Sequence, residues 1–420
     1  MNQVRRPDDE IEDPSESVDQ LDGANAPLLF LGHAADRTGP PIYLLLFLRW
    51  LRANRPEVDF EIALLAGGEL EQDFRDLEPR RMSVYEGLPP SPWDAVERAY
   101  LLQNLEFEDV WWSARRRAQI RRQMRQHAGC RVVHVNSAPS AELARLMPPG
   151  DRVILSHVHD LEVGLTHRLD PPDRETFLAD ASRLFAASEA VRSNLVAKHG
   201  VDRSKVEVHF EMVDSGPVHD VDRNPAAVAA GRARRGLPAD GFLVGASGTL
   251  DWRKAPDLFL RVAWHLSRRP GSEPVSFVWI GGTPETVGRA REEARRAGVA
   301  DRVHFVGVQA DPVEWFGLLD VFALTSREDP FPLVCLEAAS VGVPVVAFDN
   351  GGMPELLSQG CGSVAAYPDV ADFAWKVDEL LRDPIRRRSM GERGRGLITR
   401  NHDVNVLAPK LWADIEPWLP

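Results

Sequence analysis

The feature that most constrains the fold of this chain is a rhythm of short apolar runs alternating with amphipathic stretches, which occurs twice. The first series runs from PLLFLG at residues 27–32 to RLFAAS at 183–188, and the second from FLVGAS at 242–247 to GSVAAY at 362–367. Apolar strands that alternate with helices are typical of βαβ units, whose parallel sheet is covered on both faces. The sequence therefore predicts an α/β protein with two doubly wound, Rossmann-like domains that face each other.

The boundaries of these domains follow from changes in composition. Residues 211–240 are rich in Pro, Gly and charged residues and break the rhythm, so we expect a linker with one helical segment there. The first residues are acidic and poor in large apolar side chains, which is typical of disorder. The expected organisation is a disordered acidic tail over 1–25, an N-terminal domain over 26–215, a linker over 216–240, a C-terminal domain over 241–395 and, over 396–420, a C-terminal helix that packs back on the N-terminal domain.

Charge and cysteine content exclude several classes of protein. A formal net charge of -13 argues against a nucleic-acid binder, which would need positive charge to neutralise phosphates. The three cysteines are far apart and form no C-x-x-C pair, so we expect no disulfide framework, no cysteine zinc site and a cytoplasmic location. No segment approaches the roughly 18 to 20 apolar residues of a membrane span. The N-terminus lacks an apolar signal core.

Two carboxylates stand eight positions apart in the otherwise apolar passage SREDPFPLVCLE, residues 326–337. They are Asp329, just upstream of a helix expected to begin near Pro332, and Glu337, inside that helix. Taken alone, the pair could be a helix cap and a solvent-exposed acid. The position favours more, because ligands of doubly wound domains bind beyond the carboxyl ends of the strands, where helix N-termini attract anions.

Three other strand ends carry residues that suit the same kind of ligand. Asn350-Gly351-Gly352 allows a close backbone approach, Lys254 opens a helix, and HAADRTGPP at 33–41 is a Gly- and Pro-containing loop. A cation, amide donors and acceptors for hydroxyl groups are combined at strand ends of both domains. Together they favour a ligand made of phosphate and sugar.

Several blocks in this order resemble the retaining glycosyltransferases of family 4, which have the two-domain GT-B fold. The blocks are SHVHDLE at 156–162, FAASEAVRSNL at 185–195, GTLDWRKAPDLFL at 248–260 and the passage with the two carboxylates. The resemblance extends over roughly residues 27–400. It implies a metal-independent enzyme without a cofactor that moves a sugar, with retention, from a nucleoside diphosphate sugar to a carbohydrate, lipid-linked or small-molecule acceptor bound by the N-terminal domain.

The resemblance also implies roles for individual residues. The catalytic residues would be His159, Asp329 and Lys254, and the donor-binding residues Glu337, Arg253, Phe331, Pro332, Leu333, Val334, Gly351, Gly352 and Gly39. Asp329 would approach hydroxyls of the donor sugar, Glu337 would accept hydrogen bonds from the ribose, and Lys254 would face the diphosphate. The backbone amides around 331–334 would contact the sugar or diphosphate. His157 is interpreted as structural, on the opposite side of the extended segment.

The chain departs from the family pattern at three positions. Asp329 replaces the usual first glutamate of the acidic pair, and Thr249 stands where many members carry an arginine, for which Arg253 would compensate. Gly39 is followed by Pro40 rather than a second glycine, which removes one amide donor. Glu355 is interpreted as an acid that holds the GG-x-P-E turn in place.

Two further stretches leave alternatives open. The basic region at 111–129 is either a solvated helix or a surface that contacts anionic lipid or a phosphorylated acceptor, with peripheral membrane contact through 111–125. The DVD sequence at 220–222 resembles a metal-binding D-x-D but lies in the expected linker, and we interpret it as coincidence. The competing functions are a non-catalytic GT-B protein that binds a sugar nucleotide or scaffolds a partner, and another GT-B enzyme such as an epimerase or phosphorylase.

Overall fold

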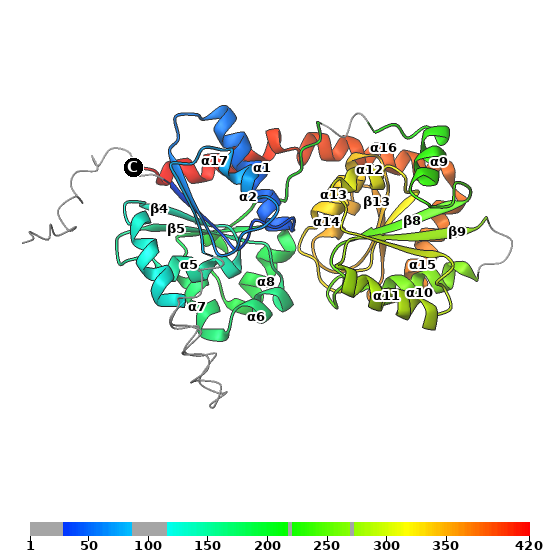
Figure 1. The fold of residues 1–420 in the computed structure, drawn as a ribbon, viewed down its shortest axis with the longest axis horizontal. Helices are drawn as coiled ribbons and strands as arrows, with labels where there is room; N and C mark the ends of the chain where they lie inside the picture. The colour runs from blue at the N-terminus through cyan, green and yellow to red at the C-terminus, as the bar shows by residue number, and fades with distance from the viewer. Residues whose placement is uncertain (1–27, 86–115, 217–220, 269–272) are drawn as a thin grey trace, which may run out of the picture.

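The computed structural model describes residues 28–85, 116–216, 221–268 and 273–420, and the predicted acidic tail lies outside them. Two parallel sheets form two lobes side by side (Figure 1). This arrangement confirms the predicted pair of doubly wound α/β domains. We call them the N-terminal lobe and the C-terminal lobe.

The N-terminal lobe contains a seven-stranded sheet with the order β3-β2-β1-β4-β5-β6-β7. Its strands are β1 (Leu28–Gly32), β2 (Phe60–Leu64), β3 (Arg81–Val84), β4 (Val132–Val135), β5 (Val153–Val158), β6 (Arg183–Ala186) and β7 (Val206–Val208). The helices between them include α1 (Gly39–Asn54), α2 (Glu71–Arg75), α5 (Ala141–Leu146), α6 (Glu162–Arg168), α7 (Pro171–Asp180) and α8 (Glu189–His199).

The C-terminal lobe contains a six-stranded sheet with the order β10-β9-β8-β11-β12-β13. Its strands are β8 (Phe242–Ser247), β9 (Val275–Ile280), β10 (Val303–Gly307), β11 (Val321–Leu324), β12 (Val345–Phe348) and β13 (Gly362–Ala365). Its helices are α9 (Pro225–Arg234), α10 (Pro256–Ser267), α11 (Pro284–Arg296), α12 (Pro312–Phe316), α13 (Leu333–Ser340), α14 (Met353–Leu357), α15 (Val370–Arg382) and α16 (Pro384–Asn401).

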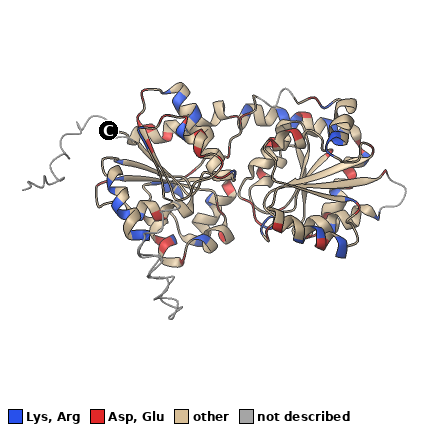
Figure 2. Ribbon diagram, viewed as in Figure 1, with Lys and Arg blue, Asp and Glu red and all other residues tan. Residues whose placement is uncertain are grey.

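Each sheet has an apolar layer on both faces, as near-continuous apolar strands require. In β1, Leu29 and Leu31 point into one layer, while Leu28 and Phe30 point into the other. Figure 2 shows the consequence: Lys, Arg, Asp and Glu gather on helices and loops, and the strands are largely free of them. Alternation of side chains along each strand therefore builds two cores per lobe.

The stretch predicted as a linker contains α9, which packs on the C-terminal lobe. The buried Arg232 of α9 donates hydrogen bonds to the Leu318 carbonyl at 2.7 Å and to the Asp320 carboxylate at 2.8 Å. A buried guanidinium needs such partners, so these bonds hold α9 against the lobe.

The chain crosses between the lobes at one place, in both directions. Val213 pairs with Asp403 in an isolated parallel bridge, and Val404 N–H donates to the Val213 carbonyl at 2.9 Å. We call residues 209–215 and 402–404 the crossover. Beyond it, α17 (Val404–Ile415) lies beside α1 on the N-terminal lobe, where its apolar face joins the same core layer as Tyr43. No helix of the described residues is long and apolar enough to cross a membrane.

Candidate active site

Two carboxylates of the C-terminal lobe bind backbone amides at helix N-termini of the N-terminal lobe. Glu328 accepts hydrogen bonds from the N–H groups of Val163, at 2.9 Å, and Gly164, at 3.0 Å, in the first turn of α6. Glu355 accepts from Glu189, at 3.0 Å, and Ala190 N–H, at 2.8 Å, in the first turn of α8. Unpaired N–H groups and the positive helix end favour such carboxylates. The strand-end loops of the two lobes therefore meet here. Glu355, interpreted from the sequence as an acid that holds its own turn in place, also links the two lobes.

Asp329 is buried in a cluster of ion pairs at this meeting edge. Lys254 Nζ lies 2.6 Å from one carboxylate oxygen, which also accepts from Ser326 Oγ at 2.8 Å. Arg253 Nη1 lies 3.3 Å from the other oxygen. Burial opposes ionisation of Asp329, but Lys254 and Arg253 outweigh it and hold the pKa of Asp329 below its usual value. Asp329 is therefore an anion that fixes the two predicted cations.

Glu337, in the second turn of α13, has the opposite environment. Its carboxylate has no hydrogen-bond or ion-pair partner in the part of the chain that the structure describes, and burial raises its pKa to about 7. The cation that acts on it most, Arg37, comes from the N-terminal lobe and donates to the Ala310 carbonyl at 3.1 Å. An unpartnered, partly buried carboxylate costs folding free energy and suits a ligand that supplies donors.

The start of α13 agrees with the prediction that a helix begins near Pro332, which occupies the N-cap position. No side chain caps the helix, so the first-turn amides of Leu333 and Val334 remain available to a ligand. Two of the predicted donor-binding residues, Phe331 and Pro332, differ from Leu333 and Val334 in what they can offer a ligand. Pro332 has no N–H and cannot donate. The Phe331 ring packs in the crossover, 5.1 Å from the Phe210 ring and stacked on His402.

The Gly351-Gly352 turn packs tightly against the loop that carries Asp329. Gly351 has φ +68°, and an added Cβ would lie 2.0 Å from the Asp329 carbonyl oxygen. A Cβ on Gly352 would lie 1.9 Å from the Pro330 carbonyl oxygen. Both glycines are thus required for loop packing, whereas the sequence favoured a close approach to a ligand. Gly39 differs, since a Cβ there would meet no heavy atom within 4 Å.

His159 follows β5 and is buried, with its ring stacked on His157 at 4.1 Å. The prediction that His157 faces the opposite side is wrong, because residues two apart in an extended segment point to the same face. His159 Nδ1 lies 2.5 Å from a Glu211 carboxylate oxygen. Sequence reasoning missed Glu211 and Glu328. Nothing in the local sequence marks Glu211, which lies three residues beyond β7.

Thr249 and Arg253, the residue expected to compensate for it, contact different carboxylates. Thr249 Oγ1 donates to Asp251 at 2.6 Å, while Arg253 reaches Asp329. With Thr249 in place of an arginine, this edge has one cation fewer. The positive charge of Arg253 lies next to Asp329 instead.

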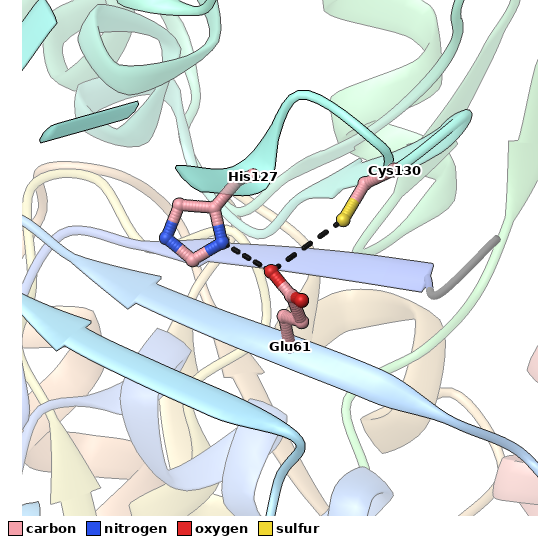
Figure 3. Close-up of side chains that lie close together, drawn as sticks. All are labelled: Glu61, His127 and Cys130. Atoms are coloured by element: carbon pink, nitrogen blue, oxygen red, sulfur yellow. Dashed lines mark hydrogen bonds and ion pairs between the residues drawn. The ribbon is translucent and has the colours of Figure 1, made fainter. Parts of the chain in front are cut away.

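One group among the described residues combines ligand atoms of three kinds, and it lies within the N-terminal lobe. Figure 3 shows Glu61 of β2 beside His127 and Cys130, with their ligand atoms within 4.8 Å of one another. His127 Nδ1 lies 2.5 Å from Glu61, and its Nε2 lies 3.1 Å from Ser83 Oγ. The Cys130 thiol donates to Glu61 at 3.6 Å, and burial, then Glu61, raises the pKa of Cys130 far above its usual value. These groups satisfy one another, whereas a metal needs the thiolate.

The basic stretch is a helix over 116–124 whose Ile120 and Met124 are buried while Arg121 and Arg122 are exposed. Its tryptophans, at 111 and 112, lie outside the described residues, so both interpretations of this stretch stay open.

In the DVD sequence, Asp222 accepts from Asn224 N–H at 2.9 Å in the turn before α9. The first aspartate of that sequence also lies outside the described residues.

Two cavities lie elsewhere on the C-terminal lobe. One of about 460 Å³ lies between α9 and α12, and one of about 340 Å³ lies beside α11 and β10. Neither is lined by Lys254, Asp329 or Glu337. Arg291, which lines the second cavity, donates to the Phe305 carbonyl at 2.9 Å, so its guanidinium is already engaged in a hydrogen bond.

Two family models match adjacent parts of the chain. The one described as Glycosyltransferase Family 4 matches residues 70–215, in the N-terminal lobe. The one described as Glycosyl transferases group 1 matches residues 229–397, which include Lys254, Asp329 and Glu337. The two matches meet at the stretch between the lobes.

Among curated relatives, the chain is 34% identical over 237 residues to D-inositol 3-phosphate glycosyltransferase 2 of Catenulispora acidiphila, a match that covers 54% of each chain. It is 33% identical over 251 residues to D-inositol 3-phosphate glycosyltransferase of Mycolicibacterium smegmatis, covering 57% of this chain and 55% of that one. The chain thus spans about half the length of the curated relatives it matches.

Among solved structures, the chain is similar to Anabaena HepE in complex with UDP-glucose, with a TM-score of 0.73, 18% identity and coverage of 93% of this chain and 99% of that one. It is also similar to sucrose-phosphate synthase from Thermosynechococcus elongatus, with a TM-score of 0.67, 18% identity and coverage of 94% and 99%. These likenesses show the fold. The chain therefore belongs to the group 1 glycosyltransferases of family 4 and has their GT-B fold of two Rossmann-like domains.

Proposed function

We propose that this protein is a glycosyltransferase that moves a sugar, with retention, from a nucleoside diphosphate sugar to an acceptor. The observation that carries the proposal is the unpartnered Glu337 carboxylate on the same helix whose N-terminus is uncapped, beside the paired Lys254 and Asp329. An acceptor of hydroxyl hydrogen bonds, free amides and a fixed cation are what a nucleoside diphosphate sugar needs.

The donor would lie along the edge of the C-terminal lobe. Glu337 would accept hydrogen bonds from the ribose hydroxyls, and the amides of Leu333 and Val334 would bind the diphosphate. Lys254 would face the leaving phosphate, held in place by Asp329 at 2.6 Å. Asp329 can still meet a sugar hydroxyl with lone pairs that its cations leave free. Because a solved structure of similar fold carries UDP-glucose, uridine is the first base to test.

The protein's share in the reaction would be orientation and charge stabilisation. The bond between the anomeric carbon and the β-phosphate oxygen breaks, and a bond from that carbon to the acceptor oxygen forms on the same face. The acceptor's proton passes to the departing phosphate. Lys254, Arg253 and the start of α13 would balance the growing negative charge without a metal, and Gly39 would let the first loop of the N-terminal lobe approach.

The acceptor would bind the N-terminal lobe, near His159. Relatives named D-inositol 3-phosphate glycosyltransferase make a phosphorylated polyol the first acceptor to test. Arg37 and Arg168 are cations at this edge, and Arg168 lies 3.3 Å from Asp160, next to His159. Carbohydrate, lipid-linked and other small-molecule acceptors remain alternatives.

The decisive experiment supplies the full chain with UDP- and GDP-sugars, with and without D-inositol 3-phosphate, glycan and lipid-linked acceptors. We expect release of the nucleoside diphosphate that depends on one donor and rises with one acceptor, and a glycosidic product with retained configuration. Nucleotide binding with no turnover on any acceptor would instead support the non-catalytic alternative. Interconversion of the free donor, or a sugar 1-phosphate formed with inorganic phosphate, would support an epimerase or a phosphorylase.

A further inference from the structure

The crossover places one buried acid against the predicted catalytic histidine. Glu211 lies three residues beyond β7, and its Oε1 is 2.5 Å from His159 Nδ1. The two side chains are only 6% and 2% exposed. A bond this short and this buried between a carboxylate and an imidazole is a strong, oriented interaction.

The other polar atom of each side chain has no partner. His159 Nε2 and Glu211 Oε2 are both buried without a hydrogen bond among the described residues. Buried polar atoms are nearly always paired, and exceptions mark places where a ligand or water completes the network. His159 directly precedes Asp160, which lies at the edge where the lobes meet, so a substrate would reach Nε2 from there.

The His159 ring cannot turn freely, because neighbours hold it on two sides. His157 stacks on it with centroids 4.1 Å apart, and the Tyr43 ring packs edge-on at 5.1 Å. With the ring held and Nδ1 bonded to Glu211, the direction of Nε2 is fixed.

The histidine and tyrosine side chains around the pair are uncharged near neutral pH, while the adjacent Asp160 pairs with Arg168 at 3.3 Å. Burial lowers the pKa of His33 and His134, to about 3 for His134, lowers that of His157 well below its usual value, and raises that of Tyr43 well above. Glu211 is therefore the charged group in direct contact with the His159 ring.

Contacts of the crossover fix Glu211 itself. The Glu211 carbonyl oxygen lies 3.3 Å from His402 Nδ1. Two residues further on, the Val213 carbonyl accepts a hydrogen bond from Val404 N–H. His402 in turn stacks on Phe331 of the motif that carries Asp329. Glu211 is thus held by the segment on which both lobes pack.

We propose that Glu211 is a positioning residue, which keeps the proton of neutral His159 on Nδ1 and so presents the Nε2 lone pair to a hydroxyl of the bound substrate. This inference rests on the proposed glycosyl transfer. A carboxylate that orients a histidine in this way fixes the tautomer and also stabilises the protonated ring.

The test compares Glu211→Gln with wild type in the full chain. Gln keeps the size of the side chain but removes the charge, so the variant should fold, with Glu207→Gln, an exposed acid on β7, as the matched control. We expect kcat to fall about 10- to 100-fold, as is typical when a carboxylate that orients a histidine is lost. UDP affinity should change less than twofold.

A second readout needs no turnover. In ¹⁵N NMR of histidine-labelled protein, with His159→Gln to assign the ring, wild type should show the proton on Nδ1 and none on Nε2, and Glu211→Gln should show a smaller share of this tautomer. Unchanged kcat in Glu211→Gln, or an unprotonated Nδ1 in wild type, would overturn the proposal. If wild type turns over no donor, the proposed function fails while the NMR comparison still decides whether Glu211 sets the tautomer.

Discussion

The two edges that meet between the lobes hold their charges in different ways. On the C-terminal lobe, Lys254, Arg253 and Asp329 neutralise one another, and each comes from the loop just beyond a strand. On the N-terminal lobe, His159 depends on Glu211, which comes from 52 positions further along the chain. The first edge is organised before any ligand arrives and by its own lobe, whereas the second is completed by the segment that joins the lobes.

The largest expected effect tests the organised edge, through Lys254→Met. This change removes the cation proposed to face the leaving phosphate, so we expect turnover to fall about 100- to 1000-fold. It also leaves Asp329 buried with Arg253 and Ser326 alone, which should lower the free energy of unfolding by several kcal/mol, as for a broken buried pair (~3–5 kcal/mol). Nucleotide release and thermal unfolding measure the two effects.

The double variant Lys254→Met with Asp329→Asn separates them. If Asp329 mainly fixes Lys254, the double variant should regain stability over Lys254→Met without regaining turnover. A Lys254→Met enzyme with near wild-type turnover would show that this edge does not carry the transferred charge.

The second effect concerns Glu337→Gln, where affinity and stability should change in opposite directions. Loss of the two charge-assisted bonds proposed between Glu337 and the ribose should weaken UDP binding about 10- to 100-fold. The free protein should gain about 1 to 3 kcal/mol of stability at pH 8, because Gln removes a carboxylate that is ionised at a cost there. Calorimetric titration with UDP and thermal unfolding measure both.

The sign of the stability change follows from the pKa of Glu337, which is raised from 4.5 to about 7 in the folded protein. A raised carboxyl pKa means that the folded state holds the proton more tightly, so wild type loses stability as pH rises from about 4.5 through 7. The advantage of Glu337→Gln should therefore be largest at pH 8 and vanish near pH 4. An advantage that is equal at both pH values would contradict the burial of an ionised Glu337.

Ligand binding should show the same titration in wild type. In the proposed complex the ribose hydroxyls donate to the ionised form of Glu337. UDP affinity should therefore fall as pH drops below about 7, by up to about tenfold per pH unit, with proton release on binding near neutrality. Isothermal titration between pH 5.5 and 8.5 in buffers of different ionisation enthalpy measures both. Glu337→Gln is the control and should lose this dependence; if it keeps it, another group is responsible.

The sequence predicts more of the site on the C-terminal lobe than on the N-terminal lobe, because local segments determine the first and distant partners the second. The sequence predicts the positions of Asp329, Glu337, Lys254 and the start of α13, because short segments at strand ends determine where they lie. The Gly351-Gly352 turn was found, but its packing on Asp329 and Pro330 requires knowing which loops are neighbours. Glu211 and Glu328 could not be found, since their partners are distant in sequence and nothing local marks them. The strand periodicity of two does place His157 on the same face as His159, as their stacked rings show.

The smallest expected effect concerns the bonds that bring the two edges together. Glu355→Gln and Glu328→Gln each weaken a carboxylate cap on a helix of the other lobe, and losing such a cap costs about 1 kcal/mol. Among the described residues, the two carboxylates accept hydrogen bonds from backbone N–H groups of the N-terminal lobe. The cost should therefore appear in how often the lobes are in contact rather than in the folding of either one.

We therefore expect each variant to raise the donor KM a few-fold with kcat nearly unchanged, and the double variant to show a larger radius of gyration by small-angle scattering. Glu285→Gln, an exposed acid on α11, is the control and should do neither. Added donor should restore the compact form, since a ligand that contacts both lobes favours the closed state in proportion to its affinity for it. If the double variant keeps the wild-type radius and KM, then packing of Phe331 in the crossover, and not the two caps, holds the edges in register.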